Sequence, residues 1–420
     1  MLGGEDSGRG SGPAQGRGRG QGRPEDVLEF GRDRRPGHRW RSRAILAGLV
    51  VVTALVVGIK TGIGSGSNGH HAHTRASRAT RTGRGVRPVR IISTGHHLLG
   101  VTAGWQLLAR GPNDLLRIQL AEGRITWTYV PSLTTGSPDV AFLPAAHETI
   151  IRPADFVPGY VVPDGGPAQL LPGPLADGGR IIPGPRGTET AWISTDPLTS
   201  YKLSLVTLSG HLAGPVIKLP AGGPQLPATA VSDGRGDVLV ADSSFTSYDA
   251  GPTWDRPLPG AIIAVGPASW LTVICDAHAQ HCRNVVIDSD SGARRVLPGA
   301  TRPAPYFFTW PPAGVISPDG RTAAVVGRVV AGRGDGPTNA VHLVNLRTGV
   351  TKDLGLRLGG TDGFPLRTIT APQTLVWSPD SRWLFVVATV GNLVAIDART
   401  DRAESLGITL PQIQQVAIRS

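Results

Sequence analysis

Two patterns of apolar residues divide the chain. The run from Ala44 to Ile59 contains no charged residue, and Lys60 follows it directly. From residue 91 to the end of the chain, short runs of β-branched residues alternate with turns rich in proline and glycine, and helical periodicity is hard to find. The first pattern predicts a transmembrane helix over residues 44–63. The second predicts an all-β domain over residues 91–420.

The charges that flank the apolar run predict its orientation. Its 16 residues would rise about 24 Å as a helix, short of a hydrocarbon core of about 30 Å, so residues 61–63 complete the span. Residues 24–43 hold six arginines, whereas residues 60–79 hold one lysine and two arginines. Because positive charge favours the cytoplasmic side, we predict a single-pass protein of the cell membrane with a cytoplasmic N-terminus and an extracytoplasmic C-terminal domain. A cleaved signal peptide is the alternative, although no Ala-x-Ala site follows the run.

A strand–turn–strand unit recurs through the all-β region. In each unit an apolar run leads into a polar turn and a second run that ends in or near a leucine or tryptophan. Five turns are clear and two are weaker. The gaps between the clear turns are 87, 82, 57 and 52 residues, and the first two are each about twice a forty-residue unit, near the repeat length of a propeller blade. We therefore predict a seven-bladed β-propeller, or a six-bladed one if a weak unit does not form. The turns are Glu122-Gly123, Ser209-Gly210, Ser291-Gly292, Thr348-Gly349 and Thr400-Asp401, with weaker units around Asp164-Gly165 and near Gly260.

A second motif marks other turns of the same region. Proline at the second position and glycine or serine at the fourth suit a type I turn between antiparallel strands. The motif occurs as Ser317-Pro318-Asp319-Gly320 and Ser378-Pro379-Asp380-Ser381, with a degenerate copy at Val231-Ser232-Asp233-Gly234. These segments resemble the Ser-Pro-Asp-Gly repeats of TolB-type and WD40-like β-propellers. The resemblance implies a propeller over residues 91–420, but not an activity, because such propellers serve as scaffolds, receptors and some enzymes.

The basic charge of the protein lies outside the predicted propeller. Residues 1–90 contain 17 lysines and arginines against six acidic residues, and their net charge of +11 equals that of the whole chain. Residues 1–43 are rich in Gly and Arg and predict a disordered basic cytoplasmic tail, and residues 64–90 predict a flexible basic linker. A propeller of balanced charge is not expected to bind nucleic acid. The excess of arginine (38) over lysine (4) suggests a GC-rich bacterial coding sequence.

Cys275 and Cys282 are the two cysteines of the chain, and apolar β-type runs flank them. Six residues between them suit a hairpin whose ends are bridged by a disulfide. Two reduced thiols are one alternative. Zinc binding with His278 or His281 is another, but the spacing matches no structural zinc pattern.

The candidate acidic residues of this region lie at turns. Asp233, Asp319 and Asp380 each occupy a position where aspartate accepts hydrogen bonds from the local backbone, which favours a structural role. The sequence assigns no catalytic residue, no metal ligand and no cofactor. We expect a membrane-anchored, non-catalytic binding or scaffold module that contacts membrane lipid through its anchor and an extracytoplasmic protein, peptide or glycan through its propeller. The alternatives are an extracytoplasmic propeller hydrolase or lyase, and a single-pass signalling protein whose tail binds a regulator.

Overall fold

The computed structural model describes only the all-β part of the chain. The chain divides into a unit of residues 1–81 and a unit of residues 82–420, and the described residues all belong to the second unit. The described residues are 89–131, 140–153, 158–171, 173–177, 181–185, 189–194, 202–218, 229–241, 247–250, 255–275, 281–298, 314–329, 338–358, 373–388 and 391–420. The predicted tail, transmembrane helix and nearly all of the linker lie outside them. In these ranges, no helix has the length and apolar character needed to span a membrane.

The described chain is almost entirely β-structure, and most of its sheets are four-stranded meanders. Three of them run in chain order: β5 (Val140–Pro144), β6 (Glu148–Pro153), β7 (Tyr160–Pro163) and β8 (Gln169–Leu170); β13 (Thr229–Ser232), β14 (Val238–Ala241), β15 (Ser247–Ala250) and β16 (Asp255–Leu258); and β25 (Leu375–Trp377), β26 (Trp383–Val387), β27 (Leu393–Asp397) and β28 (Arg402–Glu404). The fourth also runs in chain order and contains β9 (Ile181–Pro183), β10 (Thr190–Ser194), β11 (Lys202–Thr207) and β12 (Leu212–Lys218). The short helix α2 (Pro174–Asp177) precedes it.

One sheet has eight strands and is built from two such meanders. The first is β17 (Ala261–Val265), β18 (Ser269–Cys275), β19 (Cys282–Asp288) and β20 (Arg294–Val296), and the second is β21 (Gly314–Ile316), β22 (Thr322–Val329), β23 (Thr338–Asn345) and β24 (Thr351–Arg357). The first strands of the two meanders, β17 and β21, are joined by a short parallel pairing from Ala264↔Gly314 to Val265↔Val315. All other pairings in this sheet are antiparallel.

The remaining sheet joins the two ends of the described chain. Its order is β1 (Val89–Ser93), β4 (Arg124–Tyr129), β3 (Asp114–Gln119), β2 (Gln106–Arg110) and β29 (Gln415–Arg419). The last strand, β29, completes this sheet by pairing with β2, whereas β1 lies at the opposite edge and pairs with β4. As an inner strand, β2 has four of its five residues buried, whereas Ile91 in the edge strand β1 is 56% exposed.

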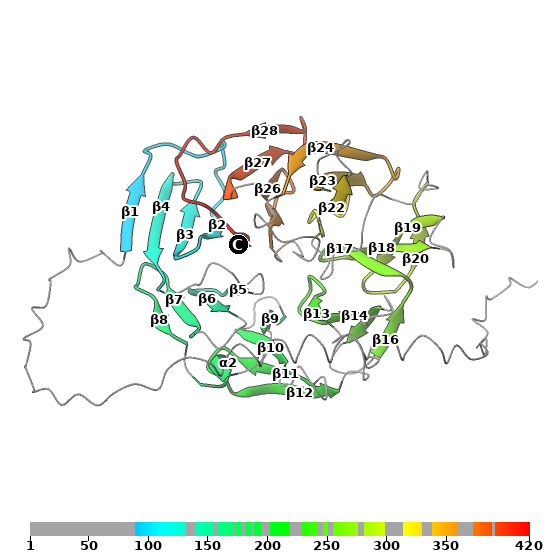
Figure 1. The fold of residues 1–420 in the computed structure, drawn as a ribbon, viewed down its shortest axis with the longest axis horizontal. Coiled ribbons are helices and arrows are strands. Elements are labelled where there is room, and N and C mark those ends of the chain that lie inside the picture. Colours follow the sequence, from blue (N-terminus) through cyan, green and yellow to red (C-terminus); the bar gives the residue numbers. More distant parts are fainter. Residues whose placement is uncertain are drawn as a thin grey trace, which may run out of the picture. The chain divides into compact units, whose positions relative to one another are not determined.

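The sheets follow one another around a ring (Figure 1). Each one packs against the next through apolar side chains from facing strands, and the last sheet, β25 to β28, packs against the first. This arrangement of radially packed antiparallel meanders, closed by strands from both chain ends, is a β-propeller. Each pair of neighbouring meanders shares one apolar cluster, and the clusters contain Leu108 and Phe142, Ile150 and Ala191, Trp192 and Val238, Leu239 and Trp270, Val273 and Val325, Val341 and Leu384, and Phe385 and Leu107.

The polar turns that the sequence singled out occupy equivalent places. Six of the seven expected positions connect the third and fourth strands of a meander, counting β29 as the first strand of its sheet. The exception is Gly260, which lies between β16 and β17 and so links two sheets. The β15–β16 turn at residues 251–254 lies outside the described residues.

The predicted disulfide is present. Cys275 ends β18, Cys282 begins β19, and the two face each other in register. Cys282 packs into the apolar cluster that joins the two halves of the eight-stranded sheet.

Candidate functional site: the closure seam

The interface between sheet β1-β4-β3-β2-β29 and sheet β5-β6-β7-β8, here called the closure seam, combines an apolar centre with buried charge. Leu108, Leu115 and Ala417 pack there against Phe142 and Ile151. Side chains two positions apart on a strand point to the same face. The same face of the first sheet therefore carries polar residues beyond this centre, at both ends of its strands: Gln106, Arg110, Arg117, Gln415 and Arg419.

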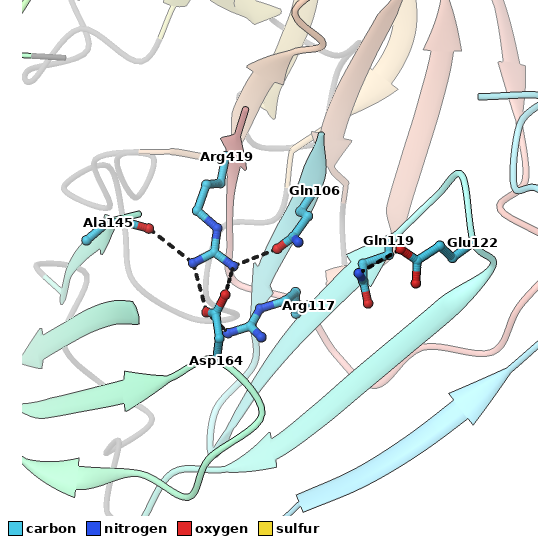
Figure 2. Close-up of polar contacts among 7 residues, drawn as sticks. All are labelled: Gln106, Arg117, Gln119, Glu122, Ala145, Asp164 and Arg419. Carbon is cyan, nitrogen blue, oxygen red and sulfur yellow. Dashed lines mark hydrogen bonds and ion pairs between the residues drawn. The ribbon is translucent and has the colours of Figure 1, made fainter. Parts of the chain in front are cut away.

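At one end of the seam, two arginines share one carboxylate (Figure 2). Arg419 donates from Nη1 to Asp164 Oδ1 and from Nη2 to Asp164 Oδ2, each at 2.9 Å. Arg117 donates from Nη2 to the same Oδ1. Arg419 also donates to Gln106 Oε1 at 2.6 Å and to the carbonyl of Ala145 at 3.1 Å. Asp164 belongs to the β7–β8 turn, so this cluster connects the first and last parts of the chain to the second sheet.

The charges of this cluster do not cancel. Both arginine side chains are 9% exposed and that of Asp164 is 35% exposed. Burial lowers the pKa of Arg117, Asp164 opposes that change, and the neighbouring charge of Arg419 adds to it. Two cations held by one anion make a strong bridge between sheets, and the carboxylate is not available as a free base.

At the other end of the seam, a buried arginine has neutral partners. Arg110 donates from Nε to Gln415 Oε1, and from Nη1 to the carbonyl of Gly111 at 3.3 Å. Gln415 in turn donates from Nε2 to the carbonyl of Val140 at 2.9 Å. Burial lowers the pKa of Arg110 to about 10.

Gln373 precedes β25 and forms hydrogen bonds to strands on both sides of the seam. Its carbonyl accepts a hydrogen bond from Val416 N, and its side-chain Nε2 donates to the carbonyl of Phe142, both at 2.7 Å. Gln373 has a φ of 70°, a left-handed conformation that is uncommon for a residue with a side chain. One residue thus connects the last strand, β29, with the first strand of the second sheet.

A carboxylate with altered acidity lies beside the cluster of Figure 2. Glu148 begins β6, and partial burial raises its pKa, with further contributions from the charges of Glu189 and Asp164. A carboxyl group of raised pKa can exchange a proton closer to neutral pH than an ordinary one. Within the described ranges, no group of three or more His, Cys, Asp or Glu residues could hold a metal ion.

The motif residues lie away from this seam, at turns between the first two strands of their meanders. Ser317-Pro318-Asp319-Gly320 connects β21 to β22, and Ser378-Pro379-Asp380 leads from β25 towards β26. In both, the aspartate accepts hydrogen bonds from the motif serine and from a backbone N–H two residues further on. Asp319 accepts from Ser317 Oγ at 2.6 Å and from Arg321 N at 3.1 Å. Asp380 accepts from Ser378 Oγ and, at 3.1 Å, from Arg382 N.

The degenerate motif copy uses its aspartate in a similar way. Asp233 Oδ1 accepts hydrogen bonds from the backbone N–H groups of Arg235, Gly236 and Asp237, at 2.7, 2.8 and 3.0 Å. Asp233 is 1% exposed. The carboxylates noted in the sequence are therefore occupied by their own turns.

The closure seam was not predicted from the sequence. The signal was present as arginine and glutamine inside otherwise apolar strands: Gln-Leu-Leu-Ala-Arg in β2, Asp-Leu-Leu-Arg-Ile-Gln in β3 and Gln-Val-Ala-Ile-Arg in β29. Charged residues are seldom buried unless they are paired, so such positions point to a polar contact across an interface. The partner strand could not be read from the pattern.

No family model and no curated protein matches the sequence. Solved structures resemble it weakly. A protein from Lactobacillus plantarum is 14% identical with a TM-score of 0.43 over 76% of this chain and 99% of its own. An oligogalacturonate lyase in complex with manganese is 13% identical with a TM-score of 0.41 over 71% and 86%. The WD40 domain of Pan2 from Neurospora crassa is 12% identical with a TM-score of 0.39 over 68% and 83%. Likenesses of this size identify neither a family nor an activity.

Proposed function

We propose that this chain is a membrane-anchored extracytoplasmic β-propeller that acts as a non-catalytic binding or scaffold module for a protein, peptide or glycan. Each four-stranded meander is one blade, the eight-stranded sheet counts as two, and the ring has seven blades. The domain order is a basic cytoplasmic tail at 1–43, a transmembrane helix at 44–63, a linker from 64 and the propeller to 420. The linker ends near residue 88, because β1 begins at Val89.

The observation that supports a binding role is that the prominent carboxylates of the propeller are engaged by other groups of the protein. Asp164 is held by two arginines that join two blades. Asp233, Asp319 and Asp380 accept hydrogen bonds within their turns. General acid–base catalysis needs carboxylates that face a substrate, whereas these carboxylates bind arginines or backbone N–H groups of the protein itself. This use of charge supports a rigid platform whose exposed turns contact a partner.

The exposed turns of the blades gather at one end of the propeller, here called the turn face. In an antiparallel meander, the first–second and third–fourth connections lie at the same end. Two hydrogen bonds of 2.8 Å link such connections directly, from Leu346 N to the carbonyl of Arg321 and from Ala398 N to the carbonyl of Arg382. We propose that the partner contacts the turn face.

An extracytoplasmic location agrees with the Cys275–Cys282 disulfide, because disulfides persist in oxidising compartments. The membrane anchor and its lipid contacts rest on the sequence alone. So does the alternative that the protein signals through its cytoplasmic tail.

A hydrolase or lyase is the second candidate, and one observation favours it. Partial burial, with the charges of Glu189 and Asp164, raises the pKa of Glu148, as is typical of a catalytic acid. In this case, turnover of a glycan or peptide would depend on Glu148.

Photo-crosslinking in intact cells separates the candidates. A photoreactive amino acid at Arg347 or Thr400, both exposed on the turn face, should yield one discrete adduct. The same residue at Leu170, which is 65% exposed on β8 at the outer edge of its blade, is the matched control and should yield none. Equal crosslinking at all three positions would contradict the proposed surface. Purified full-length protein that turns over a glycan or peptide, and loses that activity in Glu148→Gln, would support the second candidate instead.

A further inference from the structure

Arg110 carries a positive charge that no carboxylate of the described residues balances. It ends β2 and is 3% exposed. Its two hydrogen bonds go to the side-chain carbonyl of Gln415 and the backbone carbonyl of Gly111, which are both neutral. Asp114, the nearest acidic residue along the chain, forms no ion pair with it and does not contribute to its pKa. A buried charge without a counter-charge is costly unless something neutralises it.

The other end of the same seam shows how this fold treats buried arginines elsewhere. Arg117 and Arg419 lie on the same face of the first sheet as Arg110, and both pair with Asp164. Arg110 differs in that burial is the sole cause that lowers its pKa, with no opposing contribution from an anion. Among the residues that the structure describes, Arg110 therefore has no anionic partner of the kind that Arg117 and Arg419 share.

The guanidinium of Arg110 is also held in place. Gln415 is fully buried, and its Nε2 donates to the carbonyl of Val140 at 2.9 Å, so its Oε1 is directed to Arg110. Arginine has five N–H groups in a planar fork, and the two described hydrogen bonds engage one on Nε and one on Nη1. Those that remain on Nη1 and Nη2 match the spacing of two oxygens of a carboxylate or phosphate.

We propose that Arg110 is the recognition residue of a buried site for a small oxyanion, carboxylate or phosphate, and that Gln415 fixes the orientation of its guanidinium. The bound anion balances the charge of Arg110 at one end of the closure seam, as Asp164 balances charge at the other end. The site is independent of the proposed partner surface, because Arg110 lies at the opposite end of its strand from the turn face. The proposed ligand is small because Arg110 is only 3% exposed.

Equilibrium dialysis of the purified full chain in detergent tests the site. Labelled inorganic phosphate and labelled acetate are the two probes, each at an ionic strength held constant with chloride. Wild-type protein should bind one probe anion per chain, and the identity of the anion that binds assigns the site to phosphate or to carboxylate. Arg110→Met should weaken binding at least about tenfold. Arg321→Met removes an arginine whose side chain is 85% exposed and should leave binding unchanged.

A second variant keeps the test decisive if Arg110→Met does not fold. Gln415→Glu places a carboxylate against Arg110, so the protein supplies its own anion. This variant should fold, bind neither probe and show a melting temperature that does not respond to either. Wild-type protein should gain a few degrees at saturating anion. Absence of binding of both anions by wild type, or equal binding by wild type and Gln415→Glu, would overturn the proposal.

Discussion

Arg419 and Asp164 form a two-point ion pair between residues that are 255 positions apart in the sequence, with both N–O distances at 2.9 Å. The pair connects the last strand of the chain to the second sheet of the propeller. Backbone pairing of β29 with β2 closes the ring. The ion pair then links this sheet to the neighbouring sheet β5-β6-β7-β8. Since Arg117 donates to the same carboxylate, loss of Asp164 would leave two cations side by side without their anion.

The first prediction concerns Asp164→Asn. We expect the free energy of unfolding to fall by about 1–2 kcal/mol, because two largely buried arginines lose a shared charged acceptor. Urea denaturation of the full chain measures the change. Asp290→Asn is the matched control: Asp290 pairs with Arg235, its side chain is 74% exposed, and the effect should stay below about 0.5 kcal/mol. Equal effects of the two substitutions would show that the seam pair adds nothing beyond a surface pair.

The second prediction concerns a hydrogen bond between neighbouring sheets. Trp192 in β10 donates from its indole Nε1 to the carbonyl of Gly236 at 2.6 Å. Trp105 is also buried, but its indole nitrogen has no hydrogen-bond partner among the described residues. Both Trp→Phe substitutions remove similar volume, so we expect Trp192→Phe to cost about 1 kcal/mol more than Trp105→Phe in the free energy of unfolding. Similar losses in thermal or urea melts would rule out a net contribution from this hydrogen bond.

The third prediction is a pH dependence from Glu148. Its pKa in the folded protein is raised from the ordinary value of 4.5, so the folded state holds this proton more tightly than the unfolded state. The free energy of unfolding therefore decreases as pH rises from about 4.5 through the raised pKa. Glu148→Gln removes this loss and should be more stable than wild type at pH 7 by about 0.5 kcal/mol, a small value because the group is partly exposed. At pH 4 the advantage should disappear. A Glu148→Gln advantage that is the same at pH 4 and pH 7 would contradict this origin.

The fourth prediction concerns the disulfide. Cys275 and Cys282 are in register on adjacent strands, and the bond closes a short loop. Cys275→Ser with Cys282→Ser should lower the free energy of unfolding by up to about 2.5 kcal/mol without preventing folding. Mass spectrometry of protein from its native compartment should find no free thiol. Two free thiols there would count against both the bond and the extracytoplasmic location.

The sequence predicted the propeller because its repeating signals are local. Turns such as Ser209-Gly210 and Ser317-Pro318-Asp319-Gly320 act over a few residues, so their positions within a meander could be read directly. Gly260 was misplaced because glycine also suits a link between sheets, where its φ is 71°. The closure seam joins residues hundreds of positions apart, and no local pattern pairs Arg419 with Asp164. Its arginines were visible as charges inside apolar strands, but their partners depend on which sheets become neighbours in the ring.

Labelling of intact cells with a membrane-impermeant maleimide tests most directly whether the propeller is an extracytoplasmic module held by an N-terminal anchor. The full chain is used, with one new cysteine at a time. Ser209→Cys, at an exposed residue of the β11–β12 turn, should be labelled in intact cells. Ser7→Cys, in the predicted cytoplasmic tail, should be labelled only after the membrane is permeabilised. Labelling of Ser7→Cys but not Ser209→Cys in intact cells would contradict the account.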